Sequence, residues 1–136
     1  MERIIRPAAL QDLPFLADHD RHVTPAELDG IIRRGRILIL EVDGVPAGWL
    51  RWNLFWDNTP FMNMLYLLDG YRMQGHGRAL VCCWEESLRA LGYAVAMTST
   101  QANEGAQHFY RHMNYRDIGG FLQEGEPYEL ILQKTL

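Results

Sequence analysis

The sequence predicts an α/β fold in which helices cover the faces of a mixed β-sheet. Three observations predict it: a β-hairpin around Asp43-Gly44, a strand–helix–strand unit between Met62 and Thr100, and two more strand patterns near the carboxyl terminus. A strand–helix–strand unit crosses over with a right hand and places its two strands parallel. The hairpins pair antiparallel, so the expected sheet is mostly antiparallel with one parallel pair.

The amino-terminal part predicts an edge strand and two helices. A short apolar segment at residues 3–6 forms the strand, and a proline ends it before a helical pattern. That pattern consists of Leu10, Leu13, Phe15 and Leu16. Thr24 starts the second helix, because its hydroxyl caps free amides, Pro25 suits the first helical position and Glu27 completes a capping box.

A β-hairpin and a buried strand follow. Residues 36–42 are an apolar run rich in β-branched side chains, Asp43-Gly44 is a favoured two-residue turn, and residues 45–55 return with aromatic enrichment. After a polar loop at 56–60, residues 62–68 are almost continuously apolar. Such runs are typical of strands buried on both faces, so this strand is expected at the centre of the sheet.

The second half of the chain predicts two helices and three strands. The first helix carries an apolar stripe that Gly92 ends, and a strand follows at residues 93–100. A short helix then leads into a closing hairpin of residues 115–121 and 128–133. The two stripes are Leu80, Trp84, Leu88 and Leu91, and Ala106, Phe109, Tyr110 and Met113. Because no repeat or linker interrupts the pattern, residues 1–136 are expected to form one domain.

The composition excludes several classes of function. The chain carries 13 Lys and Arg against 17 Asp and Glu, and its net charge of -4 has the wrong sign for a nucleic-acid partner. The adjacent Cys82 and Cys83 suit neither a disulfide framework nor a zinc site, and are interpreted as buried thiols of a reducing compartment. No apolar run has the length of a membrane span and the amino terminus lacks a signal-peptide core, so a cytoplasmic location is expected.

The turn at residues 71–80 is a candidate anion site. It lies between a strand and the start of a helix, where unpaired amides point outward and the helix dipole attracts negative charge. Gly75 and Gly77 would let the backbone approach a diphosphate, and Arg72 and Arg78 add cationic donors. Taken alone, two glycines between a strand and a helix are more often a plain tight turn than a ligand site. The segment lacks the Lys and hydroxyl residue of a P-loop and the third small residue of a dinucleotide motif.

Two motif blocks together resemble the GNAT N-acetyltransferase family. Arg72, Gly75 and Gly77 fill its signature of Arg or Gln, two residues, Gly, one residue, then Gly or Ala. Residues 103–110 are similar to its later block Asn-x-x-Ala-x-x-Phe-Tyr, and Asn114-Tyr115 stands where the family often has Gly-Phe. The resemblance covers most of the chain. It implies a single-domain fold in which the parallel strand pair is splayed at the centre of the sheet, with helices on both faces.

The resemblance implies acetyl-CoA as the acetyl donor, bound in a V-shaped opening between the two parallel strands. The main chain of Leu65 and Leu67 would pair with the pantetheine arm, and Asn103 would contact the cofactor. Arg72 and the six residues after it would hold the pyrophosphate, mostly through backbone amides. These six residues are Met73, Gln74, Gly75, His76, Gly77 and Arg78.

The resemblance also implies a direct attack of a primary amine of a small molecule or a peptide on the thioester, within a ternary complex. The Leu65 amide would stabilise the developing oxyanion. Tyr110 would contact the cofactor and donate a proton to the departing thiolate as the general acid. Tyr110 also belongs to the apolar stripe of its helix, and the alternative is that it is only a core aromatic.

The general base is where the sequence departs from many members of that family. They often carry a glutamate near the start of the fourth strand, but Met62-Asn63-Met64 occupies that stretch here. The proton then goes to water, the amine arrives already deprotonated, or a loop carboxylate accepts it. The candidate carboxylates are Asp57, Glu126 and Glu129. Asp57 is the hypothesis of choice because it lies in the aromatic loop of residues 55–58.

Other interpretations stay open beside the enzyme. Without that glutamate, the chain also suits a non-catalytic domain that senses coenzyme A, and with a plain turn at residues 71–80 it suits a nucleotide-binding or interaction domain. The polar cluster at residues 18–22 and the pair His108 and His112 are interpreted as surface features, so no metal is expected. Because paired subunits are common in the family, the resemblance also leaves a homodimer open.

Aromatic side chains concentrate in the hairpin and the loop that follows it. They are Trp49, Trp52, Phe55, Trp56 and Phe61. Some are expected in the core, and others are expected to line an acceptor pocket, where an aromatic face suits a cationic amine. Residues 126–129 of the closing hairpin are the other candidate wall of that pocket.

Overall fold

The structure is a computed structural model that describes residues 1–136, and its seven strands form one sheet in the order β1-β2-β3-β4-β5-β7-β6. The strands are β1 (Arg3–Pro7), β2 (Ile37–Val42), β3 (Val45–Phe55), β4 (Thr59–Leu67), β5 (Val95–Gln101), β6 (Arg116–Phe121) and β7 (Glu129–Thr135). β4 and β5 pair parallel, whereas β1–β2, β2–β3, β5–β7 and β6–β7 pair antiparallel. The predicted mixed sheet with one parallel pair is confirmed.

Four α-helices connect the strands. They are α1 (Leu13–His19), which follows the short 3-10 helix η1 (Leu10–Asp12), α2 (Pro25–Arg33), α3 (His76–Ala90) and α4 (Ala106–His112). The start of α2 follows the predicted capping, because the Thr24 hydroxyl accepts a hydrogen bond from the Glu27 amide at 3.2 Å. The turn at Asp43-Gly44 has both residues at positive φ, 51° and 81°, as a two-residue hairpin turn requires.

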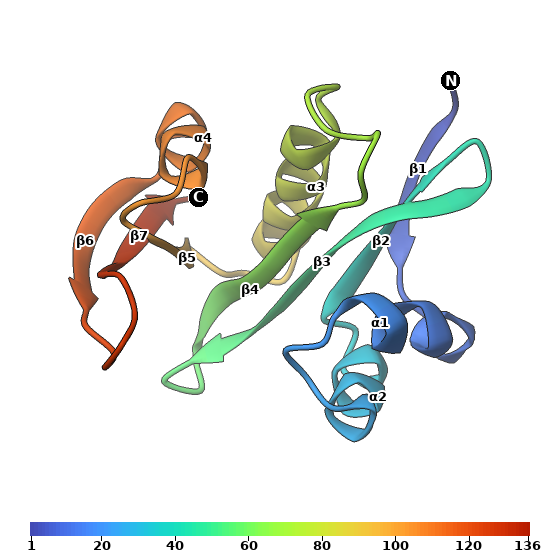
Figure 1. The fold of residues 1–136 in the computed structure, drawn as a ribbon, viewed down its shortest axis with the longest axis horizontal. Helices are drawn as coiled ribbons and strands as arrows, with labels where there is room; N and C mark the ends of the chain where they lie inside the picture. Colours follow the sequence, from blue (N-terminus) through green and yellow to red (C-terminus); the bar gives the residue numbers. More distant parts are fainter. The chain divides into compact units, whose positions relative to one another are not determined.

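The contacts divide the chain into two compact units. The first comprises Met1–Asn53 and Met64–Val81, and the second comprises Leu54–Asn63 and Cys82–Leu136. In the first unit, α1 and α2 lie on one face of β2 and β3, as Figure 1 shows. One buried cluster joins them: Leu16, Leu28, Ile31, Ile32, Ile37, Ile39 and Trp49.

The opposite face of the first unit is also covered. Successive side chains of a strand point to opposite faces, so Leu50 points away from the side that Trp49 shares with α1 and α2. Leu50 is nevertheless fully buried, as are Leu80 and Val81 in the first turns of α3. Figure 1 shows the start of α3 behind the end of β4, on the side away from α1 and α2. Helices therefore cover both faces of this part of the sheet, as the sequence predicts.

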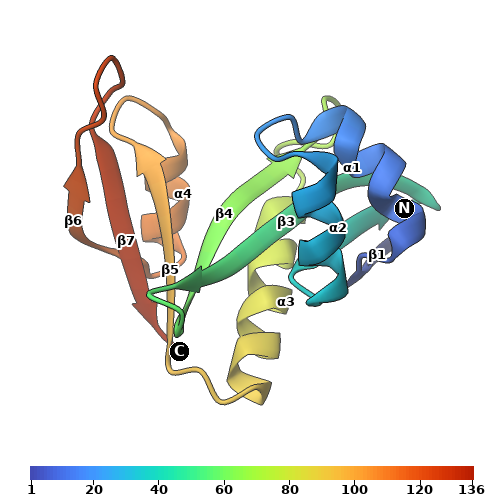
Figure 2. The ribbon, with the colours of Figure 1, turned by 90° about the horizontal axis from the view of Figure 1, so that it is seen from below.

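The second unit contains β5, β7 and β6 with α4 beside them, as Figure 2 shows. Ala96 and Thr98 of β5 and Leu132 of β7 are buried on one face of these strands. The other face carries Met97, paired with Gln133, and Ser99, paired with Ile131. Because paired residues of antiparallel strands share a face, these side chains form a second surface that faces away from Thr98 and Leu132.

Three details of the prediction were wrong. β4 begins at Thr59 rather than Met62, and it is not buried on both faces, since Asn63 is exposed and Tyr66 is 41% exposed. Leu91 lies beyond the end of α3 and is 66% exposed, because Gly92 at a φ of 91° already turns the chain. No helix combines the length and the apolar character that a membrane-spanning helix needs.

Candidate active site

The start of α3 presents unpaired backbone amides. Gly75 precedes the helix at a φ of 83°, and its carbonyl accepts the first helical hydrogen bond from the Ala79 amide at 3.1 Å. The amides of His76, Gly77 and Arg78 therefore have no acceptor inside the helix. A Cβ added to Gly75 would meet no atom within 4 Å, so the space beside the loop is open. These amides and this space are the features that an anion site at a helix start requires.

Side chains of the loop donate hydrogen bonds to backbone carbonyls near its start. Arg72 donates from Nε to the Leu67 carbonyl at 3.2 Å, and its guanidinium lies 5.2 Å from the ring centroid of Tyr66. Gln74 donates from its side-chain amide to the Gly70 carbonyl at 2.8 Å. Arg72, which the sequence predicts to be a cationic donor, is held against the end of β4. Its side chain is still 53% exposed, and its Nη2 lies 3.7 Å from Oδ1 of Asp69.

The buried His76 side chain connects the loop to β1. It is fully buried, and its Nδ1 lies 3.4 Å from Nη1 of Arg3 in β1. Arg can only donate, so Nδ1 is the acceptor and the proton resides on Nε2, which has no hydrogen-bond partner. Burial lowers the pKa of His76, and the Arg3 charge lowers it further. The imidazole is thus neutral and structural, and only the main chain of His76 is placed to contact a ligand.

The peptide groups of Leu65 and Leu67 point away from β3. A Cβ on Gly48 of β3 would stand 2.6 Å from the Tyr66 carbonyl oxygen, and the Leu68 amide donates to the Ala47 carbonyl at 2.8 Å. Since peptide groups of successive residues in a strand point to opposite edges, those of Leu65 and Leu67 face the other edge of β4. That edge is where a bound extended chain could form main-chain hydrogen bonds.

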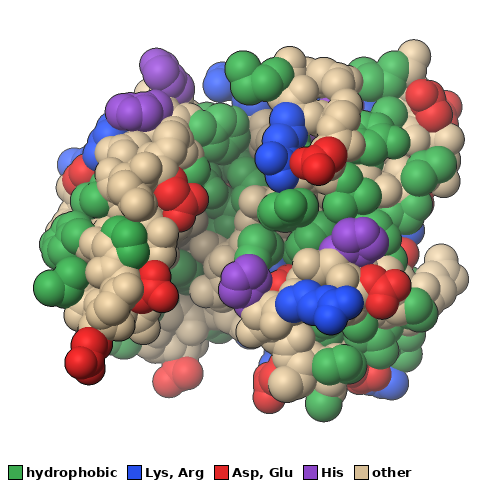
Figure 3. All heavy atoms as spheres, viewed as in Figure 1, with side chains coloured by type: hydrophobic (Ala, Val, Ile, Leu, Met, Phe, Trp, Pro, Cys, Tyr) green, Lys and Arg blue, Asp and Glu red, His purple; other side chains and the backbone are tan.

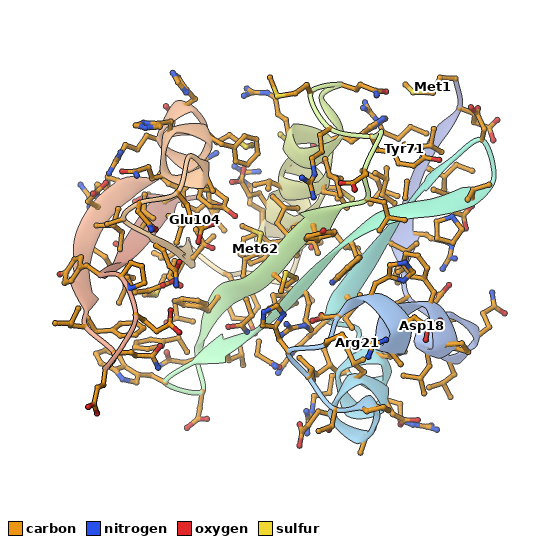
Figure 4. All side chains as sticks on the ribbon, in the orientation of Figure 1. Met1, Asp18, Arg21, Met62, Tyr71 and Glu104 are labelled. Carbon is orange, nitrogen blue, oxygen red and sulfur yellow. The ribbon has the colours of Figure 1, made fainter.

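Tyr110 of α4 is buried beside β5. It is 6% exposed, and burial raises its pKa to about 12, partly offset by a hydrogen bond with the Thr98 side chain. The Thr98 hydroxyl in turn donates to the Met62 carbonyl at 3.0 Å. Met62 is also the residue of β4 that pairs with Thr98 in the parallel register. Figure 4 labels Met62 on β4 and Glu104 in the loop before α4. Tyr110 is therefore a protonated phenol, and it is both a core aromatic and a polar group at the end of the paired β4–β5 segment.

Asn103 lies on an exposed loop that its neighbours hold in place. The Ala102 amide donates to the Tyr128 carbonyl at 2.7 Å. The Gln107 side chain donates to the carbonyls of Ala102 and Glu104, both at 2.8 Å. The loop is therefore tied to both α4 and the β6–β7 hairpin, and the Asn103 side chain is exposed to solvent.

The three candidate bases lie in different surroundings within the second unit. Asp57 is exposed at the tip of the β3–β4 turn, where it has a φ of 63°. Glu126 accepts a hydrogen bond from the Gln101 side chain at 3.1 Å. Glu129 is half-buried at the start of β7, directly opposite Gln101 in the β5–β7 register. Glu126 and Glu129 therefore lie at the same end of β5, whereas Asp57 lies on a separate turn.

Some of the aromatic residues are in the core, as the sequence predicts. Trp49 and Trp52 are buried in the first unit. In the second unit the Phe55 ring lies 4.9 Å from Trp56 and 6.0 Å from Phe61, by centroids. Trp56 is 80% exposed, an unusual position for the largest apolar side chain.

A buried polar network joins α3 to β7 and to the residue just before β6, and the sequence did not predict it. Glu85 is 2% exposed, and its carboxylate accepts hydrogen bonds from the Tyr115 hydroxyl at 2.8 Å and from Lys134 Nζ at 2.9 Å. Burial and the Glu85 carboxylate raise the pKa of Tyr115. The three residues are far apart in the sequence, and the only available signal was a Glu on the apolar side of a helix.

A second buried ion pair corrects the interpretation of residues 18–22. Asp20 was expected on the surface, but its side chain is fully buried and accepts from Arg51 Nε at 2.7 Å and from the Trp49 indole at 3.2 Å. Its carboxylate therefore ties the end of α1 to β3. No group of three His, Cys, Asp or Glu side chains is arranged to hold a metal ion.

The remaining polar candidates lie at or near the surface. His108 and His112 of α4 are exposed, and Figure 3 shows histidine side chains at the surface over that helix. Cys82 and Cys83 are half-buried rather than buried. Burial raises the pKa of Cys83, and the nearby Glu86 raises it further, so Cys83 stays a thiol.

Solved structures share the fold of this chain, with its single parallel strand pair and the glycine loop at the start of α3. Ard1 from Thermoplasma volcanium matches with a TM-score of 0.86 at 13% identity, over 100% of this chain and 99% of that chain. The ribosomal-protein-S18-alanine N-acetyltransferase from Escherichia coli matches with a TM-score of 0.83 at 16% identity, over 98% and 94%. The PaiA N-acetyltransferase from Thermoplasma acidophilum, in complex with coenzyme A, matches with a TM-score of 0.73 at 15% identity, over 100% of both chains.

The family follows from the sequence itself. The model of the acetyltransferase (GNAT) family matches residues 5–115, which include both motif blocks, so the chain belongs to that family. No curated protein matches the sequence significantly. The predicted family, fold and enzyme class are thereby confirmed, and acetyl transfer is the general activity of the chain.

Proposed function

We propose that the protein transfers an acetyl group from acetyl-CoA to a primary amine of a small molecule or a peptide. The observation that carries the proposal is the set of unpaired amides of His76, Gly77 and Arg78 beside the open space at Gly75. The family supports acetyl transfer. The E. coli relative is named for an alanine acceptor and the T. acidophilum relative is in complex with coenzyme A, which agrees with an amine acceptor and this donor.

Each part of the donor has a proposed partner. The backbone amides from Met73 to Arg78 bind the pyrophosphate, and the partly exposed guanidinium of Arg72 adds charge-assisted hydrogen bonds. The outward peptide groups of Leu65 and Leu67 pair with the amides of the pantetheine arm. Asn103, on its exposed loop, contacts the same arm.

The proposed reaction is a direct attack in a ternary complex. The neutral amine nitrogen forms a bond to the thioester carbonyl carbon, and the Leu65 amide stabilises the negative charge that develops on the carbonyl oxygen. The carbon–sulfur bond then breaks, and Tyr110 donates its phenolic proton to the thiolate. The amine nitrogen loses one proton to a base, so the products are an amide and free coenzyme A. Asp57 remains the proposed base, with Glu126 and Glu129 as the other carboxylates.

The proposal also covers the domain, the location and the partners of the enzyme. Residues 1–136 act as one catalytic domain in the cytoplasm, without a metal ion, a membrane or a nucleic acid as a partner. The acceptor and acetyl-CoA are the only ligands that the chemistry requires. A homodimer is compatible with this scheme, because the proposed donor site and acid both come from one chain.

Substitution of Gly75 by alanine tests the pyrophosphate site. Gly75 and Gly92 both have positive φ, 83° and 91°, and a Cβ at either meets no atom within 4 Å. Each change to alanine should therefore cost a similar ~1–2 kcal/mol of backbone strain. Only Gly75→Ala should weaken acetyl-CoA binding, by roughly tenfold or more in calorimetry, because its methyl group enters the space beside the free amides.

The control ligand is S-acetyl-pantetheine, which lacks the pyrophosphate. Its affinity should be the same in the wild-type protein and in Gly75→Ala. Equal acetyl-CoA affinities for the Gly75→Ala and Gly92→Ala proteins would show that the loop at the start of α3 is only a turn. Acetyl-CoA should also raise the Tm more than ATP or NAD at equal concentrations, because a selective ligand stabilises the native state by mass action.

A further inference from the structure

A pocket of about 420 Å³ lies entirely within the second unit. Its apolar walls are Phe55, Trp56, Val95, Met97, Ile118 and Ile131, with Thr59 and Gln133 as polar neighbours. Met97, Gln133 and Ile131 belong to the face of β5 and β7 opposite to the one that carries Thr98 and Leu132. The pocket therefore opens on the face of these strands opposite to Tyr110 and Glu85.

The walls favour an apolar group of substantial size. Ligand pockets in proteins typically measure roughly 300–1,000 Å³, and a cavity of about 150 Å³ already accepts benzene. The present pocket thus has room for an aromatic ring together with an alkyl chain. Trp56, 80% exposed, forms one side of it, and a ligand on its indole ring would cover that apolar surface.

Carboxylates lie at one end of the pocket. Glu129, Ile131 and Gln133 alternate along β7 and so share its pocket face. Glu129 stands two residues, roughly 7 Å, beyond Ile131. Glu126 lies nearby, because its carboxylate is bonded to the Gln101 side chain and Gln101 pairs with Glu129. A ligand with an apolar group against Ile131 would therefore hold a cationic group near Glu129.

This end of the pocket lies at the same height along β5 as the contact between Thr98 and Tyr110, the proposed general acid. Ile131 pairs with Ser99, the residue after Thr98, and Thr98 contacts the Tyr110 hydroxyl from the other face of β5. The parallel pairing of β4 with β5 is found at Phe61–Met97 and Met62–Thr98. An amine between Ile131 and Glu129 thus lies beside residues 99–101 of β5. Tyr110 contacts Thr98, the residue before that stretch.

We propose that this pocket binds the apolar group of the acceptor, so that the acceptor is a primary amine with an aromatic or bulky aliphatic substituent whose ammonium group lies near Glu129. The inference rests on the proposed function, since it names the acceptor class of that reaction. The pocket selects against polyamines and aminoglycosides, because their polar groups would lose hydration against apolar walls without gaining hydrogen-bond partners.

The first test compares acceptors by thiol release from acetyl-CoA. Phenethylamine should show a higher kcat/KM than ethylamine and putrescine, by roughly 10- to 100-fold, the factor expected for burying a phenyl group. In Trp56→Ala and in Ile118→Ser, this preference for phenethylamine over ethylamine should fall by about tenfold. Trp56 and Ile118 are 80% and 47% exposed, so these variants should fold. Leu91→Ser is the control, because Leu91 is 66% exposed and does not line the pocket.

The second test does not depend on turnover. Addition of phenethylamine should protect Trp56 from quenching by acrylamide, and the Trp56→Phe protein should lose that protected signal. Protection without thiol release from any amine would support the pocket and overturn the proposed function. Thiol release with equal preference for polar and apolar amines, with Trp56 still quenched, would overturn the pocket and leave the proposed function standing. Absence of both signals would overturn both.

Discussion

Replacement of Tyr110 by phenylalanine is expected to lower kcat by about 10²-fold while acetyl-CoA affinity stays within twofold. General acids contribute roughly 10²–10⁴-fold to such reactions. The lower figure applies here because burial raises the pKa of Tyr110 to about 12, well above the ~8.5 of an ordinary thiol. Such a phenol donates a strong hydrogen bond to the thiolate but transfers its proton less readily than a better matched acid.

The pH dependence follows from the same pKa. The phenol is protonated and able to donate below a pH of about 12, so ionisation of Tyr110 should not reduce kcat anywhere between pH 6 and 9. Any loss of activity on the acid side within that range reports the base or the amine instead. Tyr128→Phe is the matched control, because Tyr128 is 44% exposed. A Tyr110→Phe protein with wild-type kcat would remove Tyr110 from the mechanism.

Replacement of Glu85 by alanine is expected to lower the free energy of unfolding by about 3–5 kcal/mol. The substitution leaves the buried Tyr115 hydroxyl and the Lys134 ammonium without their acceptor, and the 2.8 Å and 2.9 Å hydrogen bonds are lost together. For a urea m-value of about 2 kcal/mol/M, the unfolding midpoint should fall by roughly 2 M. Urea titration followed by circular dichroism measures it.

The neighbouring residue supplies the control. Glu86 lies on the same helix but is exposed, so Glu86→Ala should change stability by no more than about 0.5 kcal/mol. Glu85→Gln should cost less than Glu85→Ala, because the amide oxygen can still accept one of the two hydrogen bonds. If the Glu85→Ala and Glu86→Ala proteins had the same midpoint, the network of Glu85, Tyr115 and Lys134 would have no structural role.

The features that the sequence predicted are those with local signals. The start of α2 at Thr24-Pro25 and the hairpin turn at Asp43-Gly44 depend on residues within a few positions of one another. The glycine loop was predicted for the same reason, because a strand, two glycines and the start of a helix all lie within residues 65–80. Family resemblance then assigned its ligand, which the glycines alone did not specify.

The features that escaped prediction depend on residues far apart in the chain. Asp20 was interpreted as a surface residue at a helix end. Its buried position depends on Arg51, which is 31 positions away in the sequence. Glu85 is separated from Tyr115 by 30 positions and from Lys134 by 49. The exposure of Tyr66 escaped for a different reason, because an apolar run does not reveal whether both faces of its strand are covered.

Thiol release from acetyl-CoA, measured with and without a primary amine and paired with mass spectrometry of the amine, tests the central claim most directly. The account predicts release that depends on the amine, with one equivalent of an N-acetylated product per thiol. Binding of acetyl-CoA without amine-dependent release from any of a panel of aromatic amines, amino acids, polyamines, aminoglycosides and peptide amino termini would contradict it. That result would instead identify a domain that senses coenzyme A.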